Sequence, residues 1–144
     1  ELTMPVCLDE SVVTAEDMEH ALSFDNLRCF SLKIAKFGGI QPTLDFYRLL
    51  RESGKTAWMG GMFDTGVSKR MHAAFCTLPG MDLPGDVSDY SAYFEHDCAW
   101  PPLVLANGEL TLNDVDHSAG LGCILDHGYI ATIAEKQITI VEGD

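Results

Sequence analysis

Short apolar segments recur along this chain at a nearly constant interval, and a polar loop and an amphipathic stretch follow each one. The four segments lie near residues 5–8, 29–34, 56–59 and 80–83. They end near residues 9, 33, 60 and 83, at intervals of 24, 27 and 23 residues. That interval is typical of repeated βα units, and short strands that are apolar on both faces are typical of parallel sheets. The sequence therefore predicts four consecutive βα units with parallel strands.

The stretches between these segments carry helix signals. Thr14 opens the first as a capping box, with Asp17 at the position that Glu usually takes. Pro42 marks the first turn of the second helix, and Gly54 is its C-terminal cap. A third helix is expected from about residue 65 to residue 77. These signals predict a helix after each of the first three strands.

The number of residues decides how much of an architecture the chain can hold. Four units in a row, with polar residues at the strand ends, favour half of a closed barrel over an open doubly wound sheet, which stays the alternative. A whole eight-unit barrel needs roughly 250 residues, and the chain has 144. Because it begins with Glu1 rather than Met, we expect an upstream segment to be missing.

The last third of the chain differs from the first part. We expect residues 1–100 to form the barrel half and residues 101–144 to form a tail. The tail carries a hairpin of 103–105 and 110–112 on an Asn107-Gly108 turn, a short helix over 129–136 and a final strand over 138–141. The fold class is thus α/β, half of a (β/α) barrel with a C-terminal hairpin and tail.

Composition excludes several classes of partner. The formal net charge is -13, which argues against nucleic acid because phosphate contacts need clustered Lys and Arg. No apolar run approaches the roughly 20 residues of a membrane span. The five cysteines are widely spaced and include no CxxC pair, so a disulfide framework is not indicated and a cytoplasmic location is expected.

Polar residues at the ends of the strands are the candidates for chemistry, since barrel active sites lie at the C-terminal ends of the strands. Asp9 and Lys33 end neighbouring strands and are expected to share one mouth. The position of Asp9 at a strand end is compatible with a metal ligand or with a plain loop residue. Lys33 either has a charge partner inside the mouth or extends to solvent, as Lys36 is expected to do. Glu10 is expected to point away from Asp9, because adjacent strand residues face opposite sides.

The third strand leads into Gly60-Gly61, and Asp64-Thr65 follows. This stretch indicates either an anion site at a helix N-terminus or a simple capped turn. The histidines have no metal-ligand spacing, and the chain has no nucleophile elbow or phosphate loop.

Four motifs together resemble one family. Residues 5–11 (PVCLDES) look like the fifth-strand motif of the muconate cycloisomerase subgroup of the enolase superfamily, and residues 32–40 (LKIAKFGGI) look like its sixth-strand lysine motif. Residues 58–66 (WMGGMFDTG) are similar to its seventh-strand loop. The region 78–94 resembles the eighth strand of the branch that holds o-succinylbenzoate synthases and N-acylamino acid racemases.

The resemblance implies a capping domain, a modified barrel and one Mg²⁺ bound by three acidic residues. It implies that Asp9 is the third metal ligand, that Lys33 is the sixth-strand lysine, and that Glu10 supports them. Gly60, Gly61, Met62 and Asp64 would contact a small carboxylate substrate. The tail would pack towards the missing capping domain.

The reaction that the resemblance implies is Mg²⁺-dependent dehydration next to a carboxylate, the lyase step of o-succinylbenzoate synthases in menaquinone biosynthesis. A racemase or a cycloisomerase on the same scaffold is the alternative. An alternative of another class is a non-catalytic half-barrel, stable as a homo-oligomer or with the missing amino-terminal half. Asp64 stands where Glu is usual, and the second-strand lysine and the first two metal ligands have no counterpart, so we expect this chain alone to be inactive.

Overall fold

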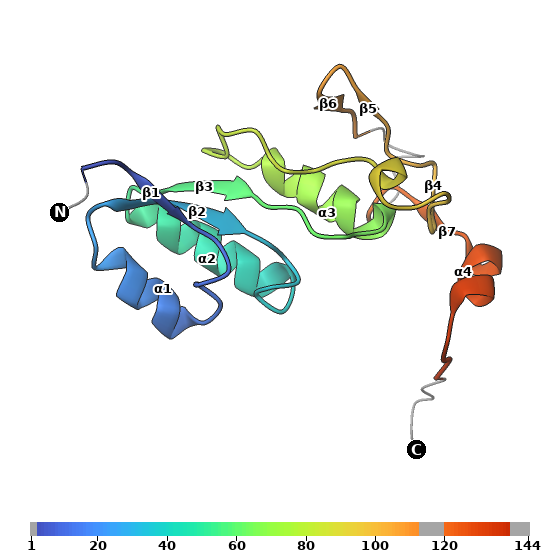
Figure 1. Cartoon of the computed structure of the whole chain (residues 1–144), viewed down its shortest axis with the longest axis horizontal. Helices are drawn as coiled ribbons and strands as arrows, with labels where there is room; N and C mark the ends of the chain where they lie inside the picture. Colours follow the sequence, from blue (N-terminus) through green and yellow to red (C-terminus); the bar gives the residue numbers. More distant parts are fainter. Residues whose placement is uncertain (1–2, 113–119, 139–144) are drawn as a thin grey trace.

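Three parallel strands form the central sheet of the computed structural model, which describes residues 3–112 and 120–138 (Figure 1). The strands are β1 (Val6–Leu8), β2 (Leu27–Leu32) and β3 (Thr56–Met59), in the order β1-β2-β3. Both pairings are parallel, as the sequence predicted. All three C-terminal ends therefore lie at one edge of the sheet.

Helix α1 (Ala15–Leu22) begins where the sequence predicted it. The Asp17 amide donates to Thr14 Oγ1 at 3.1 Å, and the Thr14 amide donates to Asp17 Oδ2 at 2.8 Å. The capping box is thus confirmed with the shorter Asp side chain. The capping box lies shortly after the residues that end β1, at the point where the chain turns back along the sheet.

Helices α2 (Ile40–Glu52) and α3 (Gly66–Cys76) follow β2 and β3. Gly54 has a positive φ of 65°, and the Lys55 amide behind it donates to Leu50 O at 3.0 Å. This closure needs glycine because L side chains rarely adopt that conformation. Both predicted helices are confirmed within two residues at each end.

The core lies on the face of the sheet that the helices cover. Phe30 and Leu32 of β2 and Met59 of β3 are at most 1% exposed. They pack in one cluster with apolar side chains of all three helices. The opposite face carries Cys7, which is exposed, and Trp58, which is half-buried. The sheet is therefore covered on one face within the described residues.

The predicted fourth strand at 80–83 is wrong. Gly80 has φ 80°, and the Met81 amide is bonded back to Leu78 O at 3.1 Å, so the chain turns here. Pro84 has no amide hydrogen to give to a ladder. The chain instead meets β3 further on, where the Asp86 amide donates to Met59 O at 2.8 Å. One backbone bond replaces the expected pairing.

The part of the chain that follows α3 forms short antiparallel pairs of strands beside that helix (Figure 1). After a 3₁₀ turn (Tyr90–Ala92), the elements are β4 (Ala99–Trp100), β5 (Leu105–Ala106), β6 (Glu109–Leu110), β7 (Ile124–Leu125) and α4 (His127–Ile133). Strand β4 pairs with β7, which the sequence did not predict, and β5 pairs with β6.

The hairpin turn is confirmed, because Asn107 and Gly108 have φ of 53° and 81°, as a type I′ turn requires. Its strands are shorter than predicted, and α4 begins two residues before the predicted helix. Ile138 is not in a strand, and the rest of the predicted final strand lies outside the described residues. None of the described helices has the length and apolarity needed to cross a bilayer.

Leu50 of α2 is fully buried against the sheet. Replacing it with alanine removes buried methyl groups and leaves a cavity, so we expect Leu50→Ala to lower the free energy of unfolding by about 2–5 kcal/mol. Urea denaturation measures it. The matched control is Ile40→Ala on the same helix, which is 47% exposed and should change stability by less than about 1 kcal/mol. Equal effects of the two substitutions would contradict the placement of α2.

Candidate active site at the strand ends

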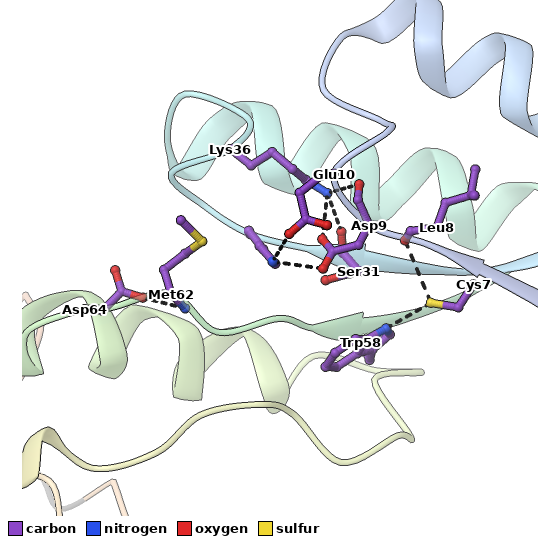
Figure 2. Close-up of polar contacts among 10 residues, drawn as sticks. Cys7, Leu8, Asp9, Glu10, Ser31, Lys36, Trp58, Met62 and Asp64 are labelled. Atoms are coloured by element: carbon purple, nitrogen blue, oxygen red, sulfur yellow. Dashed lines mark hydrogen bonds and ion pairs between the residues drawn. The ribbon is translucent and has the colours of Figure 1, made fainter. Parts of the chain in front are cut away.

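Parallel pairing places the residues that follow β1 and β2 at the same edge of the sheet. Figure 2 shows Asp9, Glu10 and Lys36 gathered there. Lys33 joins them, with Nζ 2.9 Å from Asp9 Oδ2 and 2.8 Å from Glu10 Oε1. The Lys33 side chain is 10% exposed, whereas Asp9 is 31% exposed. The expectation that Asp9 and Lys33 share one mouth is confirmed in geometry.

Lys36 does not extend to solvent, and that prediction is wrong. Its side chain is 9% exposed, and Nζ donates to the backbone oxygens of Asp9 and Ser31 at 2.7 and 2.9 Å. Nζ also lies 3.4 Å from Asp9 Oδ1. The turn that follows β2 folds Lys36 back over the strand ends, where backbone oxygens solvate the ammonium. Lys36 therefore ties the end of β1 to the end of β2.

Glu10 also departs from expectation, because it reaches the same lysine as Asp9. Strand β1 ends at Leu8, so the alternation of strand side chains no longer applies to the two residues that follow. Asp9 and Glu10 lie in a turn, and the carboxylates of both contact the Lys33 ammonium. Glu10 remains 78% exposed and is the outer member of the cluster.

The charges in this cluster shift one another's protonation. Hydrogen bonds to Asp9 and Glu10 raise the pKa of Lys33 above its ordinary value. Burial opposes ionisation of Asp9, but the hydrogen bond and charge of Lys33 outweigh it, so the pKa of Asp9 is lowered. Burial lowers the pKa of Lys36. The pKa values of these two neighbouring lysines are thus shifted in opposite directions.

Gly60 forms the floor beside Lys33. A Cβ atom at this position would lie 2.8 Å from Lys33 Cε and would also overlap the Ser31 hydroxyl. A Cβ on Gly61 would collide with the Asp86 carbonyl oxygen. Both glycines are therefore needed for close packing: the first leaves room for the lysine stem, and the second lets segment 85–87 approach β3.

Met62 and Asp64 contact each other rather than the lysines. Asp64 Oδ2 accepts from the Met62 amide at 3.1 Å and lies 3.6 Å from Nδ1 of His72. Met62 itself is 44% exposed. No hydrogen bond or ion pair between described residues links Asp64 with Lys33. Of the four loop residues predicted to contact substrate, the structure brings Gly60 against Lys33 and uses Asp64 to shape the loop.

The N-terminus of α3, one reading of which was an anion site, is occupied by a carboxylate of the chain itself. Asp97 Oδ1 accepts from the Gly66 amide at 2.8 Å. Behind it, His72 is buried at 1% exposure, and desolvation lowers its pKa. Sequence patterns indicated neither role, because Asp97 is 31 residues from Gly66 in the chain and no local signal records their contact.

The residues that could hold a hard cation in this chain are few. The parts of the chain that are described contain no group of three or more His, Cys, Asp or Glu arranged to bind a metal. Asp9, with Glu10 beside it, supplies carboxylate oxygens at the mouth, and Mg²⁺ prefers such ligands in an octahedral shell. The described residues therefore fit one part of a magnesium site, and further acidic ligands would have to come from outside them.

Comparison with known proteins gives the family. The family model described as "Enolase C-terminal domain-like" matches residues 1–129. An o-succinylbenzoate synthase of Enterococcus faecalis is 31% identical over 137 residues, 95% of this chain and 36% of the relative. An N-succinylamino acid racemase of Thermus thermophilus is 35% identical over 133 residues, 92% of this chain and 35% of the relative.

The fold agrees with the family. The crystal structure of an enolase-superfamily member from Enterococcus faecalis superposes with a TM-score of 0.80 at 31% identity, covering 91% of this chain and 35% of that one. The chain belongs to the enolase C-terminal domain-like family. It spans about a third of the length of these relatives, so it corresponds to a C-terminal part of their α/β fold.

The opposite shifts of the two lysines can be measured directly. We expect the Lys36 amine to titrate at a lower pH than the Lys33 amine, because burial dominates at Lys36 and two carboxylates dominate at Lys33. NMR of ¹³Cε-labelled lysine across pH 7–12, assigned with Lys33→Met and Lys36→Met, gives both values. Titration of Lys36 at or above the pH of Lys33 would contradict the described geometry.

Proposed function

We propose that this chain supplies the catalytic lysine and one metal ligand of a Mg²⁺-dependent lyase of the o-succinylbenzoate synthase type. The observation that carries the proposal is the pairing of Lys33 with Asp9, Nζ to Oδ2 at 2.9 Å, at the ends of adjacent parallel strands. A glycine floor beside the lysine leaves room at that mouth. Relatives over 84–95% of this chain bear the name o-succinylbenzoate synthase.

Lys33 would act by its positive charge and by its proton. With Asp9 and Glu10 on it, the ammonium is fully protonated near neutral pH and suits electrostatic stabilisation of a carbanion formed next to a carboxylate. To serve as a base it must first lose the partners that raise its pKa. Any interaction that draws the Asp9 carboxylate away would lower the pKa of Lys33 and ready it for proton transfer.

Asp9 would be the contact between this chain and the metal. Bound Mg²⁺ would supply positive charge for the negative charge that develops on the substrate carboxylate. Lys36 has a separate role, because its ammonium holds the backbone and side chain of Asp9 in place. Glu10, on the outer side, would keep a second carboxylate near Lys33 when Asp9 is engaged elsewhere.

The remaining parts of the proposal lie outside this chain. The second lysine, the other acidic ligands and the substrate contacts would come from an amino-terminal half of the same protein. The substrate would be a small carboxylate, and a reducing cytoplasm suits the five cysteines, all of which are free. An N-succinylamino acid racemase is the second candidate, because the Thermus thermophilus racemase is 35% identical.

Reconstitution tests the activity. The chain would be co-expressed with the N-terminal two-thirds of the Enterococcus faecalis relative, and dehydration and racemisation would both be assayed. We expect synthase turnover, and a loss of about 10²–10⁴-fold in kcat with Lys33→Met, the range of a lost acid–base group. Lys136→Met removes an exposed lysine and should have no effect. Turnover that survives Lys33→Met would sink the assignment, and racemisation without dehydration would favour the second candidate.

The chain alone should bind Mg²⁺ weakly and show no turnover. One carboxylate leaves most of the octahedral shell to water, which Mg²⁺ gives up reluctantly, and Asp9 is already paired with Lys33. We expect a Kd above about 1 mM by titration calorimetry. Asp9→Asn should weaken the binding further and so raise the Kd. Tight binding by the 144-residue chain would mean that it contains a complete site, against the proposal.

A further inference from the structure

Arg70 of α3 is a buried cation that has no carboxylate partner among residues 3–112 and 120–138. The residue is 4% exposed, and its Nη2 donates to the Pro101 carbonyl oxygen. Its Nε is buried and has no hydrogen-bond partner, and none of the ion pairs among the described residues includes it. A guanidinium carries five N–H donors, and the described part of the chain accepts a hydrogen bond from one of its nitrogens, Nη2.

The other buried cations show what is missing at Arg70. Lys33 has two carboxylates, and Lys36 has a carboxylate and two carbonyl oxygens. Lys69, the preceding residue, donates to the Ser88 hydroxyl and to the Asp89 carbonyl oxygen at 2.8 and 3.0 Å. Burial of a charge without such partners carries a large desolvation penalty. Among the described residues, Arg70 therefore has fewer acceptors than the other buried cations, and an anion would supply them.

Arg70 opens onto a cavity in which an anion could lie. The cavity has a volume of about 260 Å³, and its lining comes from α3, from the segment 101–106 and from the residue just after β6. Its lining is Arg70, Pro101, Pro102, Val104, Ala106 and Thr111. Among the described lining residues, Arg70 is the only charged one, and most of the others are apolar. The site belongs to α3 and the tail, and none of its lining residues takes part in the cluster around Lys33.

The chemistry of the lining selects the ligand. The planar fork of a guanidinium matches the two oxygens of a carboxylate. One positive charge neutralises a monoanion, whereas a phosphate dianion would keep an uncompensated charge among apolar walls. Proline, valine and alanine side chains offer contacts to a hydrocarbon group. We propose that this pocket binds a small apolar monocarboxylic acid through Arg70.

Benzoate is the probe for this site, with benzamide as its uncharged analogue and inorganic phosphate as the dianion. By NMR titration of the 144-residue chain, we expect saturable shifts at Arg70, Val104 and Ala106 with benzoate and none with benzamide. Arg70→Met should weaken benzoate binding by at least tenfold. The matched control is Arg48→Met, which removes an exposed arginine and should leave binding unchanged. Phosphate binding tighter than that of benzoate would overturn the assigned ligand class.

Thermal unfolding separates a ligand site from an internal structural contact. Benzoate at about 100 times its Kd should raise the Tm of the wild-type chain by several degrees and leave that of Arg70→Met unchanged. Without benzoate, Arg70→Met should unfold at or above the wild-type Tm, because it removes an unpaired buried charge. If Arg70→Met fails to fold or melts well below wild type, or if benzoate has no Arg70-dependent effect, the guanidinium is structural and the proposal is wrong.

A second variant keeps the charge and changes its shape. Arg70→Lys leaves one positive charge in the pocket but removes the planar fork, so benzoate binding should weaken by about tenfold and persist. Benzoate binding by Arg70→Lys that equals wild type would overturn the bidentate geometry. None of these readouts depends on lyase activity, so failure of the proposed function would leave this test intact.

Discussion

Parallel pairing of three short strands is the constraint on which the rest of this structure depends. Because β1, β2 and β3 run in the same direction, the residues that follow each strand meet at one edge of the sheet. The helix between two strands carries the chain back to the opposite edge. Asp9, Lys33 and Gly60 are neighbours for this reason alone. Lys33 and Lys36 both bridge the two strand ends, and their contacts with Asp9 and Ser31 hold the turns after β1 and β2 in place.

The cluster has two lysines with opposite electrostatic surroundings. Lys33 faces two carboxylates, one of them largely exposed, while Lys36 is enclosed and is solvated mainly by backbone oxygens. Such a pair separates two tasks: one ammonium is available at the mouth, and the other keeps the acidic residue in place. Because the two carboxylates raise the pKa of Lys33, a group that drew Asp9 away would lower it again.

Sequence periodicity was sufficient for the βα order, the capping box at Thr14 and the meeting of Asp9 with Lys33, because each depends on local signals and on strand direction. It was insufficient where one local choice decides the outcome. Residues 80–83 have an apolar pattern, yet the left-handed Gly80 turns the chain and Asp86 makes the single bond to β3. Glu10 was misplaced because strand alternation was extended past the end of β1. Lys36 was misplaced because a lysine that follows a strand was expected to extend to solvent. Arg70 and Asp97 depend on contacts between distant segments, which no local pattern records.

The Lys33–Asp9 ion pair links the ends of β1 and β2, and the proposed catalytic role rests on it. A double-mutant cycle of Asp9→Asn and Lys33→Met, measured by urea unfolding of the 144-residue chain, tests this most directly. Because both side chains are at least partly shielded from solvent, we predict a coupling free energy of about 1 kcal/mol. If the effects of the two substitutions were additive within about 0.3 kcal/mol, the pair would not form, and the described link between the ends of β1 and β2 would be wrong.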